Sequence, residues 1–143
     1  MTLRTILFFG KKNAAMRESS VMIPSKYSLP NEAGLNYTRE NDGKGHIGES
    51  VTQEGSPLWL MDSYVELYNP VEGLDPFIRR VLMKRTPKTR PIRGPDTMKL
   101  KNFMYRCAIE GDLDKFSGTE SVFSLDGEEF YRMVFSGGLS DVA

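Results

Sequence analysis

The chain has 143 residues, of which 39% are hydrophobic and 27% are charged, and its formal net charge at neutral pH is zero. This length predicts one small domain with a single core. A lone cysteine excludes an intrachain disulfide, and a lone histidine excludes a zinc site built from cysteine and histidine ligands.

The zero net charge conceals four blocks of alternating sign. Residues 1–17 carry four bases and no acid, and residues 18–76 carry ten acids against three bases. Residues 77–106 hold ten bases against one acid, and residues 107–143 hold eight acids against two bases. Such blocks can bind an external anion, bind the opposite block of another copy in a homo-oligomer, or neutralise one another within one fold.

The first predicted segment, residues 1–16, mixes apolar and basic side chains. As a short helix it would gather apolar side chains with bases beside them, which is typical of a peripheral membrane-binding segment. The alternative is that Ile6 to Phe9 form a strand or dock into the core. This apolar run is too short for a signal peptide or a membrane span. The predicted membrane-binding residues are Leu3, Arg4, Ile6, Leu7, Phe8, Phe9, Lys11 and Lys12.

Residues 17–56 are rich in glycine, proline, serine, asparagine and acids, and show no lasting hydrophobic period. This composition predicts a flexible linker, of which short pieces could still pack on a surface or bind a partner. Residues 43–48 match the G-x-G-x-x-G spacing of dinucleotide sites. We interpret the match as chance, because no strand is predicted before it and no helix after it.

Residues 57–143 form the predicted folded domain. The alternation in residues 63–68 favours a strand with one buried face. Asp75 and Pro76 predict the start of a helix, and apolar side chains spaced on one helical face follow them. These apolar side chains belong to Phe77, Ile78, Val81 and Leu82.

Two later segments predict further strands. Residues 99–110 favour a strand whose buried face carries Tyr105 and Cys107, with a helix as the competing interpretation. Residues 120–125 and 128–135 flank Asp126-Gly127, a pair typical of hairpin turns. The order predicts an α+β fold, with a largely antiparallel sheet, one helix packed across it and a flexible N-terminal tail before it.

Candidate chemistry is concentrated in the basic residues of the helix and of the proline-rich loop after it, which is predicted to be exposed, so that its bases would not be core residues. Neighbouring acids such as Asp112 and Asp114 are typical of a solvated turn, and Cys107 is expected to be an inert core residue. We therefore predict a protein that is not an enzyme, with no catalytic residues, cofactor or metal. The basic patch favours phosphate or an acidic surface, with a merely solvated face as the alternative. Its residues are Arg79, Arg80, Lys84, Arg85, Lys88, Arg90 and Arg93.

Several segments together resemble the matrix proteins of animal rhabdoviruses, those of the vesiculovirus type in particular. MTLRTILFFGKK is similar to their short basic and apolar N-terminus, which a flexible linker follows. SYVELYNPV and then DPFIRRVLMKR resemble the first strand and helix of their globular domain. FMYRCAIE and SGTESVFSLDGEEFYRMVF resemble the next strands. The resemblance covers the first dozen residues and most of residues 62–135.

The resemblance implies a structural protein of the virion, found also in the host cytoplasm and at the inner face of the membrane. Such a protein self-associates and links the nucleocapsid to an anionic membrane during assembly and budding. The membrane-binding residues named above would contact lipid, and the basic helix and loop would contact the nucleocapsid or RNA. The alternative hypothesis is a small RNA-associated module of a ribonucleoprotein assembly, held by the same helix and loop.

Overall fold

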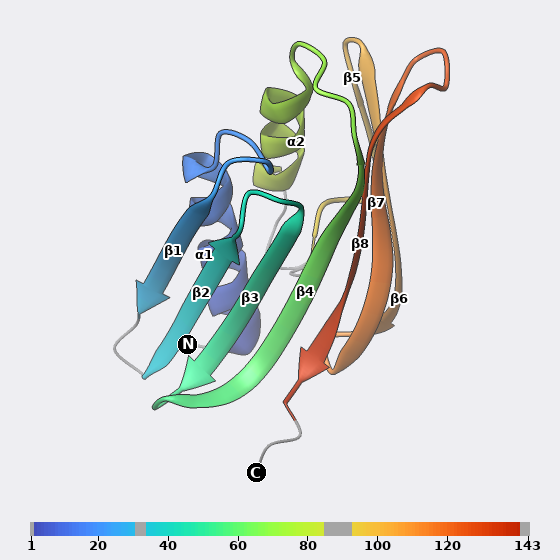
Figure 1. The fold of residues 1–143 in the computed structure, drawn as a ribbon. Coiled ribbons are helices and arrows are strands. Elements are labelled where there is room, and N and C mark those ends of the chain that lie inside the picture. Colours follow the sequence, from blue (N-terminus) through green and yellow to red (C-terminus); the bar gives the residue numbers. More distant parts are fainter. Residues whose placement is uncertain (1, 31–33, 85–92, 141–143) are drawn as a thin grey trace.

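The computed structural model describes residues 2–30, 34–84 and 93–140. In chain order these residues form a helix, four strands, a second helix and four more strands (Figure 1). The elements are α1 (Leu3–Arg17), β1 (Ser25–Pro30), β2 (Leu35–Asn41), β3 (His46–Gln53), β4 (Ser56–Tyr68), α2 (Leu74–Met83), β5 (Thr97–Leu100), β6 (Phe103–Asp112), β7 (Lys115–Ser124) and β8 (Glu129–Leu139).

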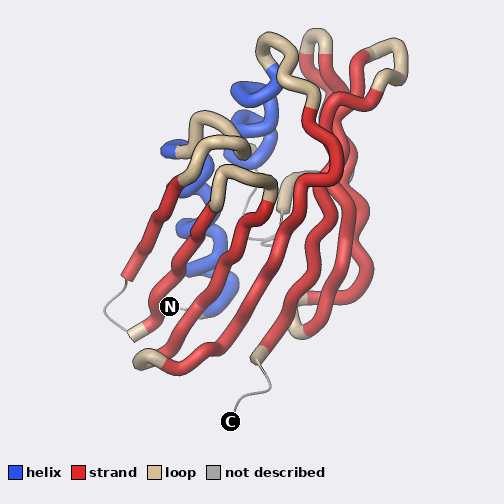
Figure 2. Tube along the Cα trace, viewed as in Figure 1, coloured by secondary structure: helices blue, strands red, loops and turns tan. Residues whose placement is uncertain are grey.

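The strands form one sheet in the order β1-β2-β3-β4-β8-β7-β6-β5, and every neighbouring pair is antiparallel. The sheet thus consists of two four-stranded meanders that β4 and β8 join edge to edge. Each meander follows a helix, so the chain repeats the order helix and four strands. Both helices lie on the same face of the bent sheet (Figure 2). The prediction of an α+β fold with a largely antiparallel sheet is confirmed.

Helix α1 begins where Thr2 caps it, because the Thr2 hydroxyl accepts a hydrogen bond from the backbone N–H of Thr5 at 3.2 Å. Its inner face carries Ile6 and Leu7, which are fully buried against the sheet. Gly10 permits the close approach, since a Cβ there would lie 2.4 Å from the ring of Tyr37. The helix is therefore part of the core, as the alternative interpretation of Ile6 to Phe9 proposed.

A single apolar core lies between the helices and the sheet face that they cover. It joins Ile6 and Leu7 of α1 with Phe77 and Val81 of α2. The strands contribute alternate residues, as half-buried strands must. The fully buried large side chains from the strands include Tyr37, Ile47, Trp59, Met61, Tyr105, Tyr131 and Met133.

The flexible linker predicted over residues 17–56 is wrong. This segment contains β1, β2 and β3, which pair in register with one another and with β4. The boundary predicted at residue 57 falls one residue after β4 begins. No flexible tail precedes the sheet within the described residues, and two helices rather than one pack on it.

Of the other local predictions, one is wrong and others are confirmed. Residues 99–110 are not one strand, because Lys101 adopts a left-handed φ of 51° in the turn between β5 and β6. Tyr105 and Cys107 do share the buried face of β6. Asp126-Gly127 lies in the turn between β7 and β8, as predicted. Within residues 43–48, Gly43 and Gly45 lie in the β2–β3 turn with positive φ, and a strand follows rather than a helix.

Candidate anion-binding pocket

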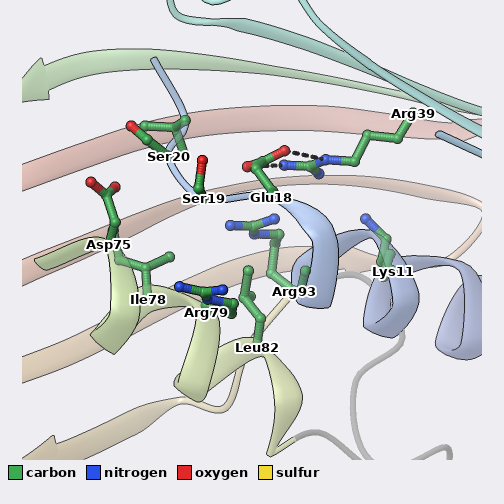
Figure 3. Close-up of a pocket in the computed structure, with 12 residues that line it drawn as sticks. Lys11, Glu18, Ser19, Ser20, Arg39, Asp75, Ile78, Arg79, Leu82 and Arg93 are labelled. Atoms are coloured by element: carbon green, nitrogen blue, oxygen red, sulfur yellow. Dashed lines mark hydrogen bonds and ion pairs between the residues drawn. The ribbon is translucent and has the colours of Figure 1, made fainter. Parts of the chain in front are cut away.

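A polar pocket opens between α1, α2 and the covered face of the sheet (Figure 3). Its volume is about 420 Å³ including the open mouth, and the centre of a water molecule has only about 30 Å³ to occupy. The interior therefore has room for a small polar group and little more. We call it the helix–sheet pocket; its lining residues are Lys11, Ala15, Glu18, Ser19, Ser20, Val21, Arg39, Asp75, Ile78, Arg79, Leu82 and Arg93.

The first half of the chain contributes a buried carboxylate, Glu49 on β3. Its Oε1 accepts a hydrogen bond from Lys11 Nζ at 2.8 Å and lies 3.5 Å from Nη1 of Arg39. The Tyr37 hydroxyl on β2 also donates to this oxygen. Glu49 therefore holds an ammonium from α1 and a guanidinium from β2 at the floor of the pocket.

The second half repeats this arrangement with Glu120 on β7, the third strand of its meander. Arg93 donates to Glu120 through Nε at 2.8 Å and Nη2 at 2.6 Å. The hydroxyls of Tyr105 and Tyr131 donate to the same carboxylate at 2.5 and 2.9 Å. Glu120 and its three partners are buried. Both halves of the fold thus use a buried glutamate and a tyrosine of the adjacent strand to hold a cation.

Arg39 and Glu18, which both line the pocket, form a further ion pair there. Arg39 donates to Glu18 through Nε at 3.0 Å and Nη2 at 2.9 Å, in the two-bond geometry favoured by guanidinium and carboxylate groups. Glu18 is the residue at which the chain leaves α1, with extended backbone angles. This carboxylate comes from the chain after a helix, whereas those of Glu49 and Glu120 come from the sheet beneath.

The electrostatics keep these groups charged. Burial raises the pKa of Glu49, but the charges of Lys11, Arg39 and Arg93 outweigh it and lower the pKa to about 2. Burial likewise raises the pKa of Glu120, and Arg93 lowers it by more. Burial lowers the pKa of Arg93, whereas the carboxylate of Glu120 raises it well above the ordinary arginine value. The floor of the pocket is therefore a set of fixed charges rather than of groups that titrate near neutrality.

Arg93 and Arg79 have donors to offer to a ligand. The two bonds from Arg93 to Glu120 use two of the five N–H donors of a guanidinium, and Nη1 makes no hydrogen bond within the described part of the chain. Arg93 is 3% exposed and lines the pocket. Arg79 of α2 also lines it and forms no ion pair among the described residues. In Figure 3 both side chains lie near Glu18.

The structure places the predicted membrane-binding residues mainly inside the fold. Ile6, Leu7 and Phe8 are buried, and Lys11 is paired with Glu49. Leu3 is partly buried against the core, Lys12 is partly exposed with its ammonium 5.6 Å from the ring of Phe8, and Arg4 and Phe9 are exposed. The helix therefore turns most of its apolar side chains toward the sheet rather than toward a lipid surface.

The predicted anion-binding residues separate into three groups. Arg79 and Arg93 meet in the helix–sheet pocket, although the loop prediction made Arg93 a solvent-exposed base. That part of the prediction is wrong, because Glu120 draws Arg93 into the core. Arg80 and Lys84 are exposed on α2 away from this pocket. Arg85, Lys88 and Arg90 lie outside the described residues.

Sequence reasoning missed the acids and one of the bases that build the pocket: Glu18, Arg39, Glu49 and Glu120. A signal for Glu49 exists in the alternation of its strand. Glu49 stands between Ile47 and Val51, and all three share the covered face of β3. An acid at an inward position of an alternating strand must find a buried cation, because burying an unpaired charge is very costly.

Residues 40–140 match the model of a protein family described as domain of unknown function DUF5680. The chain belongs to the DUF5680 family. No curated protein and no solved structure matches the chain. The DUF5680 match begins near the end of β2, so it includes Glu49, Arg79, Arg93 and Glu120 and leaves out α1, β1 and most of β2.

Two further findings concern other kinds of site. In residues 2–30, 34–84 and 93–140, no three histidine, cysteine, aspartate or glutamate side chains gather as metal ligands would. Neither described helix is long and apolar enough to cross a membrane.

Proposed function

We propose that this protein is a binding protein that holds the anionic group of a small molecule in the helix–sheet pocket. The observation that carries the proposal is Arg93, a buried guanidinium with one side fixed by Glu120 and unused donors at the pocket. Arg79 and Lys11 add positive charge from α2 and α1. The ligand class is therefore a carboxylate or a phosphate ester, since both accept several N–H donors.

The shape of the pocket supports recognition of a head group rather than enclosure of a whole molecule. The interior has room for a group of a few atoms, and among the residues that line the pocket Ser19 is exposed and Ser20 and Asp75 are partly exposed. The pocket also lies where the two halves of the fold meet, a frequent position for ligand sites. A ligand would thus bridge α1 and β2 of the first half with α2 and Arg93 of the second.

The proposal is for binding rather than catalysis because of the protonation states. General acid–base catalysis works best with groups whose pKa lies near the working pH. Here the pKa of Glu49 lies at about 2, and the carboxylate of Glu120 raises that of Arg93 well above its ordinary value. Arg93 therefore stays cationic and can attract and orient an anion without exchanging protons near neutral pH, while Glu49 and Glu120 hold the cations in place.

Calorimetric titration with inorganic phosphate and with acetate tests this function. Arg79 forms no ion pair with another residue in the described ranges, so Arg79→Gln is expected to fold and to bind the anion about tenfold more weakly. Arg80→Gln is the matched control, since Arg80 is the neighbouring exposed base and does not line the pocket. Binding by neither anion, or equal affinities of the two variants, would show that the proposal is wrong.

The wider hypotheses from the sequence remain proposals. The exposed bases Arg80 and Lys84 support contact with a large anionic partner, whether the nucleocapsid, RNA or lipid of an assembly protein. The burial of Ile6, Leu7 and Phe8 does not favour the lipid contact assigned to them. Flotation with anionic vesicles and a gel-shift experiment with RNA, each repeated on an Arg80→Ala, Lys84→Ala variant, separate these partners.

A further inference from the structure

Three carboxylates hold the cations of the helix–sheet pocket, and one of them differs from the other two. The side chains of Glu49 and Glu120 are fully buried on sheet strands beneath the pocket. The side chain of Glu18 is 12% exposed and lines the pocket itself. Glu49 and Glu120 are thus fixed parts of the core, whereas Glu18 occupies a position that is open to a ligand.

Glu18 also lies at the end of a helix rather than within a helix or strand. It caps the C-terminal end of α1 with extended backbone angles, and its backbone N–H still bonds to the carbonyl oxygen of Ala14 at 3.0 Å. Rotation about its side-chain bonds alone would carry the carboxylate from Arg39 to the solvent at the mouth. No helix or strand needs to shift for this exchange.

The bond pattern between Glu18 and Arg39 is that of a bound carboxylate. Two parallel N–H donors, Nε and Nη2, meet the two oxygens at 3.0 and 2.9 Å. The guanidinium plane is held from the other side, because Nη1 of Arg39 lies 3.5 Å from Glu49. Arg39 therefore presents Nε and Nη2 as a fixed pair of parallel donors, here called the fork, and the carboxylate of Glu18 occupies it.

We propose that Glu18 is an internal stand-in for the ligand, and that a carboxylate ligand binds by displacing Glu18 from Arg39. This inference rests on the proposed function and names its ligand class. The planar two-oxygen group of a carboxylate reproduces the contacts of Glu18, with Arg79 and Arg93 at its side. Because the competing group is tethered to the site, it acts at a high effective concentration and weakens the observed affinity for ligand.

The inference predicts that removing the competing charge tightens binding. Glu18→Gln is expected to bind acetate at least about tenfold more tightly than the unmodified chain, since the neutral amide competes poorly for the fork. Glu40→Gln, which removes an exposed acid from β2, is the matched control and is expected to bind as the unmodified chain does. Titration calorimetry gives the affinities, and the NMR signal of the Arg39 Nε–H reports whether the fork changes partner.

The outcomes separate this inference from the proposed function. If the unmodified chain and Glu18→Gln bind acetate equally, or the variant binds more weakly, displacement is wrong while the anion site stands. Absence of binding by acetate and phosphate to both chains, with thermal unfolding intact, overturns the site itself. Tighter binding of phosphate but not acetate overturns the carboxylate class. If Glu18→Gln does not fold, Glu18→Asp decides, because its shorter side chain reaches the fork less well and should also bind acetate more tightly.

Discussion

Glu49 shows at the scale of one residue how much the fold depends on its buried charges. Its carboxylate is fully buried and faces Lys11 and Arg39, so neither cation is left without a counter-charge. Replacing one member of such a group leaves the charges of the others buried without a counter-charge, which strongly destabilises the folded state. We therefore expect Glu49→Gln to lower the free energy of unfolding by about 3 to 5 kcal/mol.

The same residue predicts how stability depends on pH. The pKa of Glu49 is about 2 in the folded chain and is expected near its ordinary value of about 4.3 in the unfolded chain. Because the folded pKa is the lower one, the ion pairs contribute fully above about pH 5 and are lost as the pH falls toward 2. Urea unfolding between pH 6 and pH 2.5 should show this loss, with a smaller slope in Glu49→Gln. Parallel slopes in the two chains would contradict it.

Two residues of the pocket can be predicted as anion-binding from the sequence, because they belong to a clear run of basic residues. Arg79 and Arg93 belong to that run, and both reach the pocket. Which bases would be buried was not predictable, because the choice depends on Glu120, an acid 27 residues further along the chain from Arg93. Pairings over such distances follow from strand order, which local spacing does not reveal.

At the scale of elements, β2 and β3 show why the sequence of the first meander predicts a flexible linker instead of strands. Their covered faces carry Leu35, Tyr37, Ile47 and Val51, but charged residues interrupt both rows. The glycines around them lie in hairpin turns with positive φ rather than in a flexible chain. A strand with a buried ion pair lacks the clean alternation on which sequence prediction relies. The Asp126-Gly127 hairpin was predictable because this pair is typical of hairpin turns, and because Tyr131, Met133 and Phe135 alternate without interruption on the covered face of β8.

Helix α1 offers a test of its packing at Gly10. Alanine normally favours a helix over glycine by about 1 kcal/mol. Here a Cβ would lie 2.4 Å from two atoms of the Tyr37 ring, which is itself fixed by its hydrogen bond to Glu49. We expect Gly10→Ala to lower the free energy of unfolding by about 1 to 3 kcal/mol through overpacking. Met16→Ala on the exposed side of the same helix should change it by less than about 0.5 kcal/mol.

Chemical denaturation followed by circular dichroism gives both values. Gly10→Ala that is as stable as the original chain, or more stable, would show that α1 does not press on Tyr37 as described. A large loss in Met16→Ala would show instead that the outer side of the helix is covered.

At the scale of the whole molecule, the two buried pairs explain the alternating charge blocks. Lys11 of the first basic block pairs with Glu49 of the first acidic block, and Arg93 of the second basic block pairs with Glu120 of the second acidic block. Lys11 lies in the helix of the first half and Arg93 follows the helix of the second half, and each pairs with a glutamate on the third strand of its own meander. The interpretation that the blocks neutralise one another within one fold is supported for these residues, whereas Arg80 and Lys84 of the second basic block are exposed.

The place of α1 in the molecule yields the last prediction. A membrane arm could be removed without harm to the domain behind it. In the structure, removal of residues 1–17 uncovers Tyr37 and takes from Glu49 its ammonium partner. Burial of each large apolar side chain contributes roughly 1.5 to 3 kcal/mol. Because small domains are stable by about 5 to 15 kcal/mol in total, we expect the truncated chain to lose cooperative unfolding.

Thermal and urea unfolding of the truncated chain measure this directly. A chain carrying Phe9→Ala and Met16→Ala is the control, since both side chains lie on the exposed side of α1 and their loss should leave the transition cooperative. A truncated chain that unfolds cooperatively at the original midpoint would mean that α1 is an appendage of the sheet. In that case the core would consist of the strands and α2 alone, and the helix–sheet pocket, which Lys11 and Ala15 of α1 help to line, would not be a site.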